Sequence, residues 1–317
     1  MNIGILGAGG IAHVLARTML QMEEVNLMAV ASRTLDKAKA FAEEFNIPKA
    51  FGSYEEMLKD PDVKLVYIAT PHSHHFEHMK MCIEHGKAVL CEKAFTFTAE
   101  EAKEIMELSM KTGVYAAEAI WTRYMPSRAM INELLKEEPM GKVCMATCNL
   151  SYDIDQVERI IRPELAGGAL LDVGVYGLNF LTMHMGKDIK KIDSSVVMTD
   201  TGVDGMETIT IHYNDGRIGV ATHGIYGRSD RKGIFYCERG YIIVENINNP
   251  NSIDLYDGSD KLIKHIPVPK QISGYEYEIR EAIEAIEAGR NESSSMPLSE
   301  SVYMMEMMDG IRSGFKA

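Results

Sequence analysis

Positive charge is scarce in this chain of 317 residues. It has 33 lysines and arginines against 46 aspartates and glutamates, which gives a formal net charge of −13 at pH 7. An acidic protein repels the phosphate backbone of nucleic acids unless a basic patch compensates, and the basic stretches here are no longer than pairs such as Lys190-Lys191. The composition therefore argues against a nucleic acid as partner.

Long apolar runs and a leader segment are lacking as well. No apolar run reaches the roughly 18 residues of a membrane-spanning helix, and residues 1–20 have neither the basic start nor the cleavage site of a signal peptide. The few cysteines include no C-x-x-C pair, which predicts reduced, buried or half-buried thiols and no structural zinc site. We expect a soluble, cytoplasmic protein without a membrane partner. The cysteines are Cys82, Cys91, Cys144, Cys148 and Cys237.

The first part of the chain alternates short apolar strands with amphipathic helices. Strands are expected at 2–6, 25–31, 63–69, 87–91 and 114–117, with helices between them, two of which carry capping-box spacings at Ser53/Glu56 and Thr98/Glu101. This alternation predicts a Rossmann-type, doubly wound parallel sheet covered on both faces. We assign it to residues 1–121.

The rhythm changes after Trp121. A helix near 127–137 is followed by strand-like runs at 142–152, 194–199, 207–213, 219–224, 233–237 and 241–244, with hairpin turns at 214–216 and 238–240. Strands that follow strands predict an α+β domain, residues 122–317, with a mostly antiparallel open sheet. Helices near 275–288 and 298–312 end the chain, and the last could also pack back on the first domain.

A glycine-rich turn directly follows the first strand. Gly7-Ala8-Gly9-Gly10-Ile11-Ala12 has the pattern G-x-G-x-x-A. The first glycine permits a tight turn, the second lets backbone amides approach a pyrophosphate, and Ala12 allows close helix–strand packing. The expected cofactor-binding residues of this turn are Gly7, Gly9, Gly10, Ile11 and Ala12.

The end of the second strand indicates which dinucleotide is bound. An NAD-selective site needs an acidic residue there, whereas this chain has Ser32 and Arg33. A hydroxyl and a guanidinium suit a 2′-phosphate, so we predict a preference for NADP(H). The alternative is that Arg33 is an ordinary surface residue and the protein takes NAD(H) as well.

Several histidines follow the strand at 63–69. The run Thr70-Pro71-His72-Ser73-His74-His75 lies where a doubly wound sheet binds its ligands, which favours a cofactor-loop role. His74 and His78 share a helix face and could together bind a metal, but only Glu77, on another face, is near enough to complete the ligands. We predict no metal site.

Motifs spread along the chain carry a resemblance to a known family. They are, in order, Thr70-Pro71, His75, Gly86-Lys87, Cys91-Glu92-Lys93 and Gly167-Gly168-Ala169-Leu170-Leu171-Asp172-Val173-Gly174-Val175-Tyr176. This set resembles the Gfo/Idh/MocA oxidoreductases over nearly the whole chain. The segments 118–126 and 274–312 look like its branch of dimeric dihydrodiol dehydrogenases and NADP-dependent aldose dehydrogenases.

The resemblance implies roles for particular residues. Lys93 would contact the substrate hydroxyl and the nicotinamide ribose, Asp172 would orient the substrate, and Tyr176 would be the acid/base group where most of the family has histidine. A nearby cation such as Lys93 can lower a tyrosine pKa from about 10 towards neutrality. Ala94 replaces the family proline, which makes a cis peptide after Lys93 doubtful. The other implied cofactor-binding residues are Thr70, Pro71, His72, His75, Glu92, Lys93, Trp121 and Arg123, the last two as pocket walls.

These features together predict a nicotinamide-dependent dehydrogenase acting on CH–OH groups. The expected substrate is an aldose, a polyol or a trans-vicinal diol, and relatives of this kind assemble as homodimers or homotetramers through the C-terminal sheet. Two alternatives remain: a cofactor-binding regulator without turnover, and another family reaction, such as a glycosidase using transient NAD oxidation or a biliverdin-type reductase. Asp153, Asp155, Arg159 and Arg162 either line the substrate opening or are simply solvated.

Overall fold

The computed structural model describes residues 1–315 and divides into two compact units. The first comprises Met1–Tyr124 and Gln271–Glu306, and the second comprises Met125–Lys270 and the chain from Met307 onward. The sequence suggested one boundary after residue 121. Residues 271–306, assigned there to the second domain, group instead with the first unit. The boundary falls inside the last helix, α10 (Leu298–Ser313).

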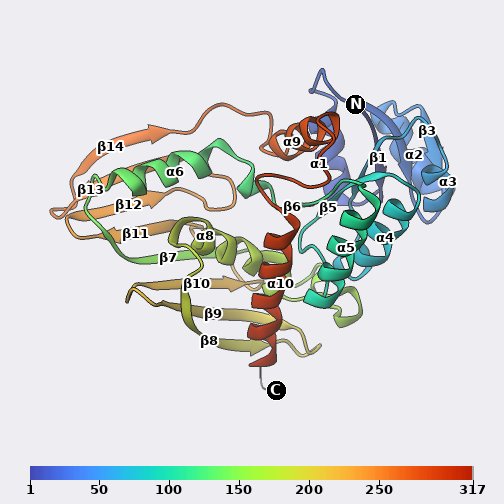
Figure 1. Ribbon diagram of the computed structural model, residues 1–317. Coiled ribbons are helices and arrows are strands. Elements are labelled where there is room, and N and C mark those ends of the chain that lie inside the picture. Colours follow the sequence, from blue (N-terminus) through green and yellow to red (C-terminus); the bar gives the residue numbers. More distant parts are fainter. Residues whose placement is uncertain (316–317) are drawn as a thin grey trace. The chain divides into compact units, whose positions relative to one another are not determined.

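The first unit contains a six-stranded sheet with the order β3-β2-β1-β4-β5-β6 (Figure 1). All of its strand pairs are parallel, so the predicted doubly wound sheet is confirmed. The strands are β1 (Asn2–Leu6), β2 (Asn26–Ala31), β3 (Lys49–Phe51), β4 (Leu65–Ile68), β5 (Ala88–Glu92) and β6 (Ala116–Ala119). The helices are α1 (Gly10–Met19), α2 (Leu35–Phe45), α3 (Tyr54–Leu58), α4 (His75–Glu84), α5 (Ala99–Thr112) and α9 (Glu276–Glu287), with short 3-10 turns η1 (His72–His74) and η2 (Trp121–Arg123).

The strands of this sheet are apolar on both faces because helices cover both. Every residue of β4 and β5 is buried, which is the pattern of a parallel sheet without a solvated side. Helix α9 adds Ile279, Ala282 and Ile283 to the same core. The unit therefore needs a segment that lies about 150 residues further along the chain than β6.

The two expected capping boxes behave differently. Thr98 accepts a hydrogen bond from the Glu101 amide, and the Glu101 side chain accepts one from the Thr98 amide, which makes a complete capping box on α5. Ser53 stands at the N-cap of α3, but its side chain makes no capping hydrogen bond. The expected short helix at Ser53 is confirmed, at five residues, whereas the capping box suggested by the Ser53/Glu56 spacing is not formed.

The second unit contains an eight-stranded sheet with the order β14-β13-β12-β11-β7-β10-β9-β8. One pair, β7 with β10, is parallel and the others are antiparallel. The predicted mostly antiparallel sheet is confirmed, and so are the hairpins β9–β10 and β11–β12. The strands are β7 (Val143–Ser151), β8 (Ile189–Met198), β9 (Asp204–Tyr213), β10 (Ile218–Gly224), β11 (Gly233–Cys237), β12 (Gly240–Val244), β13 (Ser252–Asp257) and β14 (Leu262–Pro267).

One face of this sheet is covered by helix α8 (Val175–Met185), which contacts β7 and β10 (Figure 1). A π-helical turn, η4 (Leu170–Gly174), leads directly into α8. The unit's other helical segments are α6 (Pro126–Glu137), α7 (Glu158–Ile161) and η3 (Pro163–Leu165). Nearly every residue of α8 is buried, so it is apolar all round rather than amphipathic.

The segment Pro163–Met185 is long and apolar enough to cross a membrane by length and composition alone. However, 89% of its most apolar window is buried inside the protein. Burial on this scale is typical of a core helix, which matches the place of α8 against the sheet. Among the cysteines, Cys144 is exposed, contrary to the expected burial, while Cys148 on the same strand is buried.

Candidate active site

The glycine turn after β1 brings backbone close to backbone. Gly7 has φ +109° and donates its amide hydrogen to the Ala31 carbonyl at 2.9 Å, and a Cβ at this position would lie 2.8 Å from the Ala69 carbonyl oxygen. A side chain at Gly9 or Gly10, in contrast, would meet no atom within 4 Å. These two glycines therefore leave open space beside the first turn of α1, where unpaired amides can approach an anion.

A cavity of about 310 Å³ opens beside this turn. Its lining combines the glycine turn, the end of β2 and the loop after β4, which are the carboxyl ends of neighbouring parallel strands. The lining residues are Gly7, Ala8, Gly9, Ser32, Arg33, Lys37, Tyr54, Ala69, Thr70, Pro71, His74 and His78. The open space at Gly9 and the two cations fit a dinucleotide, whose pyrophosphate needs close backbone and whose phosphates need positive charge.

Two lining residues, Lys37 and Tyr54, were not anticipated from the sequence. Lys37 follows Arg33 by four positions at the start of α2, and in sequence it looks like any solvated helix lysine. The one sequence feature that could have indicated a cofactor role for Lys37 is that it is a second basic residue, after Arg33, close behind the second strand. Of the predicted residues, Ala12 is fully buried in the core, which fits its expected packing role.

Two histidines near the cavity are neutral. Burial lowers the pKa of both His75 and His78 to about 4. The His75 ring nitrogens lie 2.8 Å from the Ala94 carbonyl oxygen and 2.9 Å from the Thr70 carbonyl oxygen, and His78 Nδ1 lies 3.0 Å from Thr70 Oγ1. His75 thus joins the loop after β4 to the segment after β5. Within residues 1–315, no group of three or more His, Cys, Asp or Glu side chains is arranged to hold a metal.

Lys93 directly follows β5, and its peptide bond to Ala94 is cis. The expectation that a cis peptide would be absent here, because Ala94 replaces the family proline, is therefore wrong. Buried carboxyl groups support this strand end: Tyr67 Oη lies 2.9 Å from Glu92 Oε1 and 2.8 Å from Glu278 Oε1, and the Phe95 amide donates to Glu118 Oε1 at 3.2 Å.

These carboxyl groups have abnormal proton affinities. Burial, and then the charge of Glu92, raises the pKa of Glu278 well above its ordinary value, and burial raises that of Glu118 to about 7. Because the Tyr67 hydroxyl has one hydrogen for two carboxyl oxygens, a protonated Glu278 lets both short contacts be hydrogen bonds.

Trp121 and Arg123 lie in the interior of the first unit. The Trp121 ring stacks on Tyr275 with 4.1 Å between centroids, and Arg123 Nη1 lies 3.2 Å from Glu300 Oε2. The Arg123 side chain is 3% exposed. Both residues therefore have partners from the returning segment 271–306.

Asp172 and Tyr176 lie in the second unit, on η4 and the first turn of α8. They are four positions apart, so their side chains share one helix face. Both are buried, and Arg159 Nη1 lies 2.9 Å from Asp172 Oδ1. Of the other residues considered for the substrate opening, Asp153 is exposed and Arg162 pairs with Glu158 and Glu164.

Comparisons with known proteins agree with this fold. Residues 1–119 match the family described as "Oxidoreductase family, NAD-binding Rossmann fold", and residues 129–243 match the "GFO/IDH/MocA C-terminal domain". The trans-1,2-dihydrobenzene-1,2-diol dehydrogenases of Xenopus tropicalis and Mus musculus are each 33% identical to this chain. The alignments cover 96% of this chain for the Xenopus protein and 98% for the mouse protein, and 95% of each relative. A solved 3-ketoreductase from Actinomadura kijaniata, in complex with NADP and TDP-benzene, aligns with a TM-score of 0.91 at 20% identity, over 99% of this chain and 97% of that one.

The fold and the glycine turn thus define an NAD(P)-binding oxidoreductase with a C-terminal α+β domain. The chain belongs to the Gfo/Idh/MocA family, and its curated relatives named above are dehydrogenases of a hydroxyl-bearing substrate.

Proposed function

We propose that this enzyme prefers NADP(H) and transfers hydride between it and a small polyol, sugar or vicinal diol. The observation that carries the cofactor preference is the joint presence of Arg33 and Lys37 in the cavity beside the glycine turn, together with the buried Ser32. Two cations and a hydroxyl suit a ribose 2′-phosphate. When bound, the nicotinamide supplies or accepts the hydride.

The rest of the cavity would hold the remainder of the dinucleotide. The turn at Gly7 and Gly9 gives the pyrophosphate close access to backbone amides. The ring of His78, neutral because burial lowers its pKa to about 4, adds no positive charge to the cavity lining. Positive charge is thus concentrated at Arg33 and Lys37. This asymmetry orients an anionic group towards α2.

We propose Lys93, Asp172 and Tyr176 as the catalytic residues, following the family motif. Tyr176 would take the hydroxyl proton during oxidation and return it during reduction, and the Lys93 ammonium would favour the phenolate. Asp172 would orient the substrate hydroxyl. Its carboxylate is suited to this, because Arg159 holds one oxygen at 2.9 Å while the side chain stays 7% exposed.

The proposed assembly is a homodimer or homotetramer that uses the sheet face opposite α8. Apolar side chains on this face are unusually exposed, with Val197 at 55%, Met206 at 45% and Ile218 at 36% of their surface. Exposed apolar side chains gathered on one sheet face favour association with a second copy.

Initial rates of nicotinamide reduction, followed by absorbance, test the proposed function. The panel contains aldoses, polyols and cyclic vicinal diols, each with NADP⁺ and with NAD⁺. We expect turnover in one substrate class and a higher kcat/KM with NADP⁺. A protein that binds NADPH but turns over nothing in the panel would favour the regulatory alternative, and equal rates with both cofactors would contradict the preference.

A further inference from the structure

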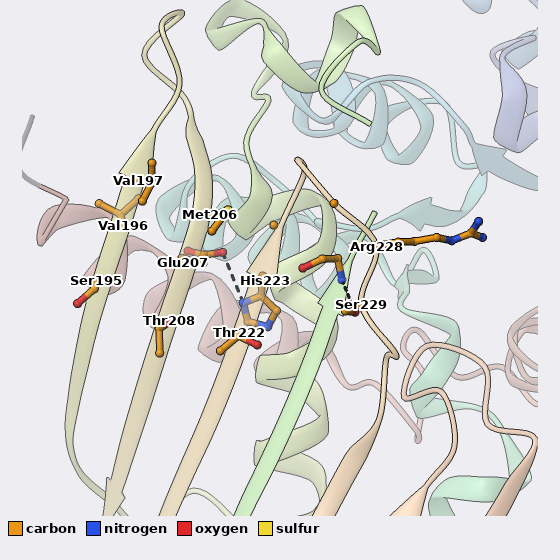
Figure 2. Close-up of a pocket in the computed structure, with 13 residues that line it drawn as sticks. Ser195, Val196, Val197, Met206, Glu207, Thr208, Thr222, His223, Arg228 and Ser229 are labelled. Carbon is orange, nitrogen blue, oxygen red and sulfur yellow. Dashed lines mark hydrogen bonds and ion pairs between the residues drawn. The ribbon is translucent and has the colours of Figure 1, made fainter. Parts of the chain in front are cut away.

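Three buried polar side chains lie beneath the segment that carries Asp172 and Tyr176. They are Asp204 and Glu207 of β9 and His223 of β10, and we call them the β9–β10 cluster. Figure 2 shows two of them, Glu207 and His223. The three residues of the cluster are 7%, 4% and 3% exposed, respectively. Neither the sequence patterns nor the proposed chemistry assigns them a role.

Each member of the cluster approaches a glycine of the segment 168–177. A Cβ at Gly174 would lie 2.7 Å from Glu207 Oε1, and one at Gly168 or Gly177 would collide with the side chain of Asp204 or His223, respectively. The glycines of the family motif are therefore the places where the cluster touches the helix backbone. Their absent side chains make this close approach possible.

Asp204 also fixes the start of the segment. Its Oδ2 accepts a hydrogen bond from the Leu170 amide at 2.5 Å, which satisfies a donor at the beginning of the π-helical turn. π-helical turns are rare and are frequently found at functional sites. Support from outside the helix is what holds such a turn in place.

Glu207 and His223 face each other directly across the β9–β10 hairpin. Glu207 Oε1 lies 3.6 Å from His223 Nδ1, and both side chains are fully buried. A dashed line marks this contact in Figure 2. Within residues 1–315, none of the oxygen and nitrogen atoms of these two side chains has a hydrogen-bond partner at normal length. Burying such groups costs stability, so an apolar pair would serve a merely structural core better.

Glu207 and His223 touch the helix on sides that differ from that of Asp172. At about 100° per residue, Gly174 lies about 160° and Gly177 about 140° around the helix axis from Asp172, and Gly177 lies about 100° from Tyr176. A shift of the backbone at these glycines would therefore move Asp172 and Tyr176 with it.

We propose that Asp204, Glu207 and His223 are positioning residues that set the π-turn and thereby orient Asp172 and Tyr176. Their role in catalysis rests on the proposed function, whereas their role in holding segment 168–177 does not. Asp204 accepts a hydrogen bond from the Leu170 amide at the start of the π-turn. The Glu207–His223 pair fills the space beside Gly174 and Gly177, which have no side chains.

Burial keeps the Glu207–His223 pair uncharged near neutral pH. Burial raises the pKa of Glu207 to about 8 and lowers that of His223 to about 3, so near neutral pH the pair is a carboxylic acid beside a neutral imidazole. Burial raises the pKa of Asp204 to about 6, and the hydrogen bond from the Leu170 amide and, less strongly, the charge of Arg312 of α10 oppose that rise. From η4 and α8, the residues that face Glu207 and His223 are the glycines Gly174 and Gly177, which carry no charge.

Hydrogen–deuterium exchange of the full-length protein tests the positioning directly. Glu207→Leu removes the acid at similar size, Glu207→Gln keeps a neutral hydrogen-bond donor towards His223, and Ile211→Val is a control four positions along the same buried strand face. We expect amide exchange in residues 170–177 to rise about tenfold in Glu207→Leu and to stay near wild type in the other two.

The same variants give a second readout if the enzyme turns over. Glu207→Leu should lower kcat about tenfold while the Kd of NADPH stays within about twofold, and Glu207→Gln should restore kcat. Wild-type protein without turnover would contradict the proposed function and leave the exchange result standing. Unchanged exchange at 170–177 in Glu207→Leu, or equal increases in Glu207→Leu and Ile211→Val, would overturn the positioning role.

Discussion

Arg159 and Asp172 form an ion pair between a half-exposed guanidinium and a buried carboxylate. The Nη1 to Oδ1 distance is 2.9 Å, and the side chains are 46% and 7% exposed. Arg159 was one of four candidates for the substrate opening, and it is the one that reaches the family motif. One oxygen of Asp172 is held, which limits how the carboxylate can turn.

Replacing Arg159 should therefore weaken catalysis modestly. We expect Arg159→Met to lower kcat/KM about fivefold, because a hydrogen bond to a charged group that is partly solvated contributes about 1 kcal/mol. Arg162→Met is the matched control, since Arg162 pairs only with the exposed Glu158 and Glu164 among the ion pairs of the described chain. Equal losses in both variants would contradict a specific role for Arg159.

Arg33 and Lys37 should determine the discrimination between the two dinucleotides. Arg33→Ala and Lys37→Ala should each raise the Kd of NADP⁺ about tenfold or more and change that of NAD⁺ by less than about twofold. Lys39→Ala on the same helix, outside the cavity lining, is the control. Fluorescence titration with both cofactors measures the ratio, and an unchanged ratio in Arg33→Ala would exclude the 2′-phosphate role.

Lys93 and Tyr176 should act as one unit. We expect Lys93→Met and Tyr176→Phe each to lower kcat by about 10²–10³, and the double variant to be little worse than either single one. The Kd of NADPH for Tyr176→Phe should stay near wild type and serves as the folding control. Losses that multiply in the double variant would show that the residues contribute independently.

The buried Glu207 should make stability fall as pH rises. Its pKa is raised to about 8 in the folded protein from a reference of 4.5, so the unfolded chain binds fewer protons between these values and unfolding becomes easier with increasing pH. For His223 the pKa is lowered to about 3 from 6.5, so its contribution is lost as pH falls through that window. Glu207→Gln should remove the first effect only.

Thermal melts over pH 5–8, about the range where Glu207 titrates differently in the two states, measure this difference. The Tm of Glu207→Gln relative to wild type should increase steadily with pH. A constant difference across the range would mean that Glu207 titrates normally in the folded protein.

Much of the fold could be predicted because local patterns decide it. The strands β1, β2, β4 and β5 are short and mostly apolar between amphipathic helices, which leaves few interpretations other than a parallel sheet. Strand β13 and the edge strand β14 were missed. β14 is almost entirely exposed and contains Lys264 and His265, so it has no buried face to produce an alternating apolar pattern.

The site was predictable where a motif names its residues, and less so where it depends on pairing across the chain. The only local signal for Lys37 as a lining residue is that it repeats a basic residue after the second strand, and nothing local marks Tyr275 as the partner of Trp121. The pairing of Glu207 with His223 could have been predicted from the sequence. A hairpin turn at 214–216 pairs residues whose numbers add up to 430, which places these two opposite each other. Their burial beneath Gly174 and Gly177 depends on tertiary packing that the turn does not specify.

The first unit is assembled from two stretches separated by about 146 intervening residues, Met125–Lys270. During synthesis the parallel sheet emerges from the ribosome long before α9, which supplies Ile279, Ala282 and Ile283 to its core and Glu278 to Tyr67. The nucleotide-binding half is thus the first to begin translation, but it is completed only after residues 125–270 of the other half have been made. Its nascent form exposes an unfilled apolar surface while the other half folds, which is the interval when chaperones would be most needed.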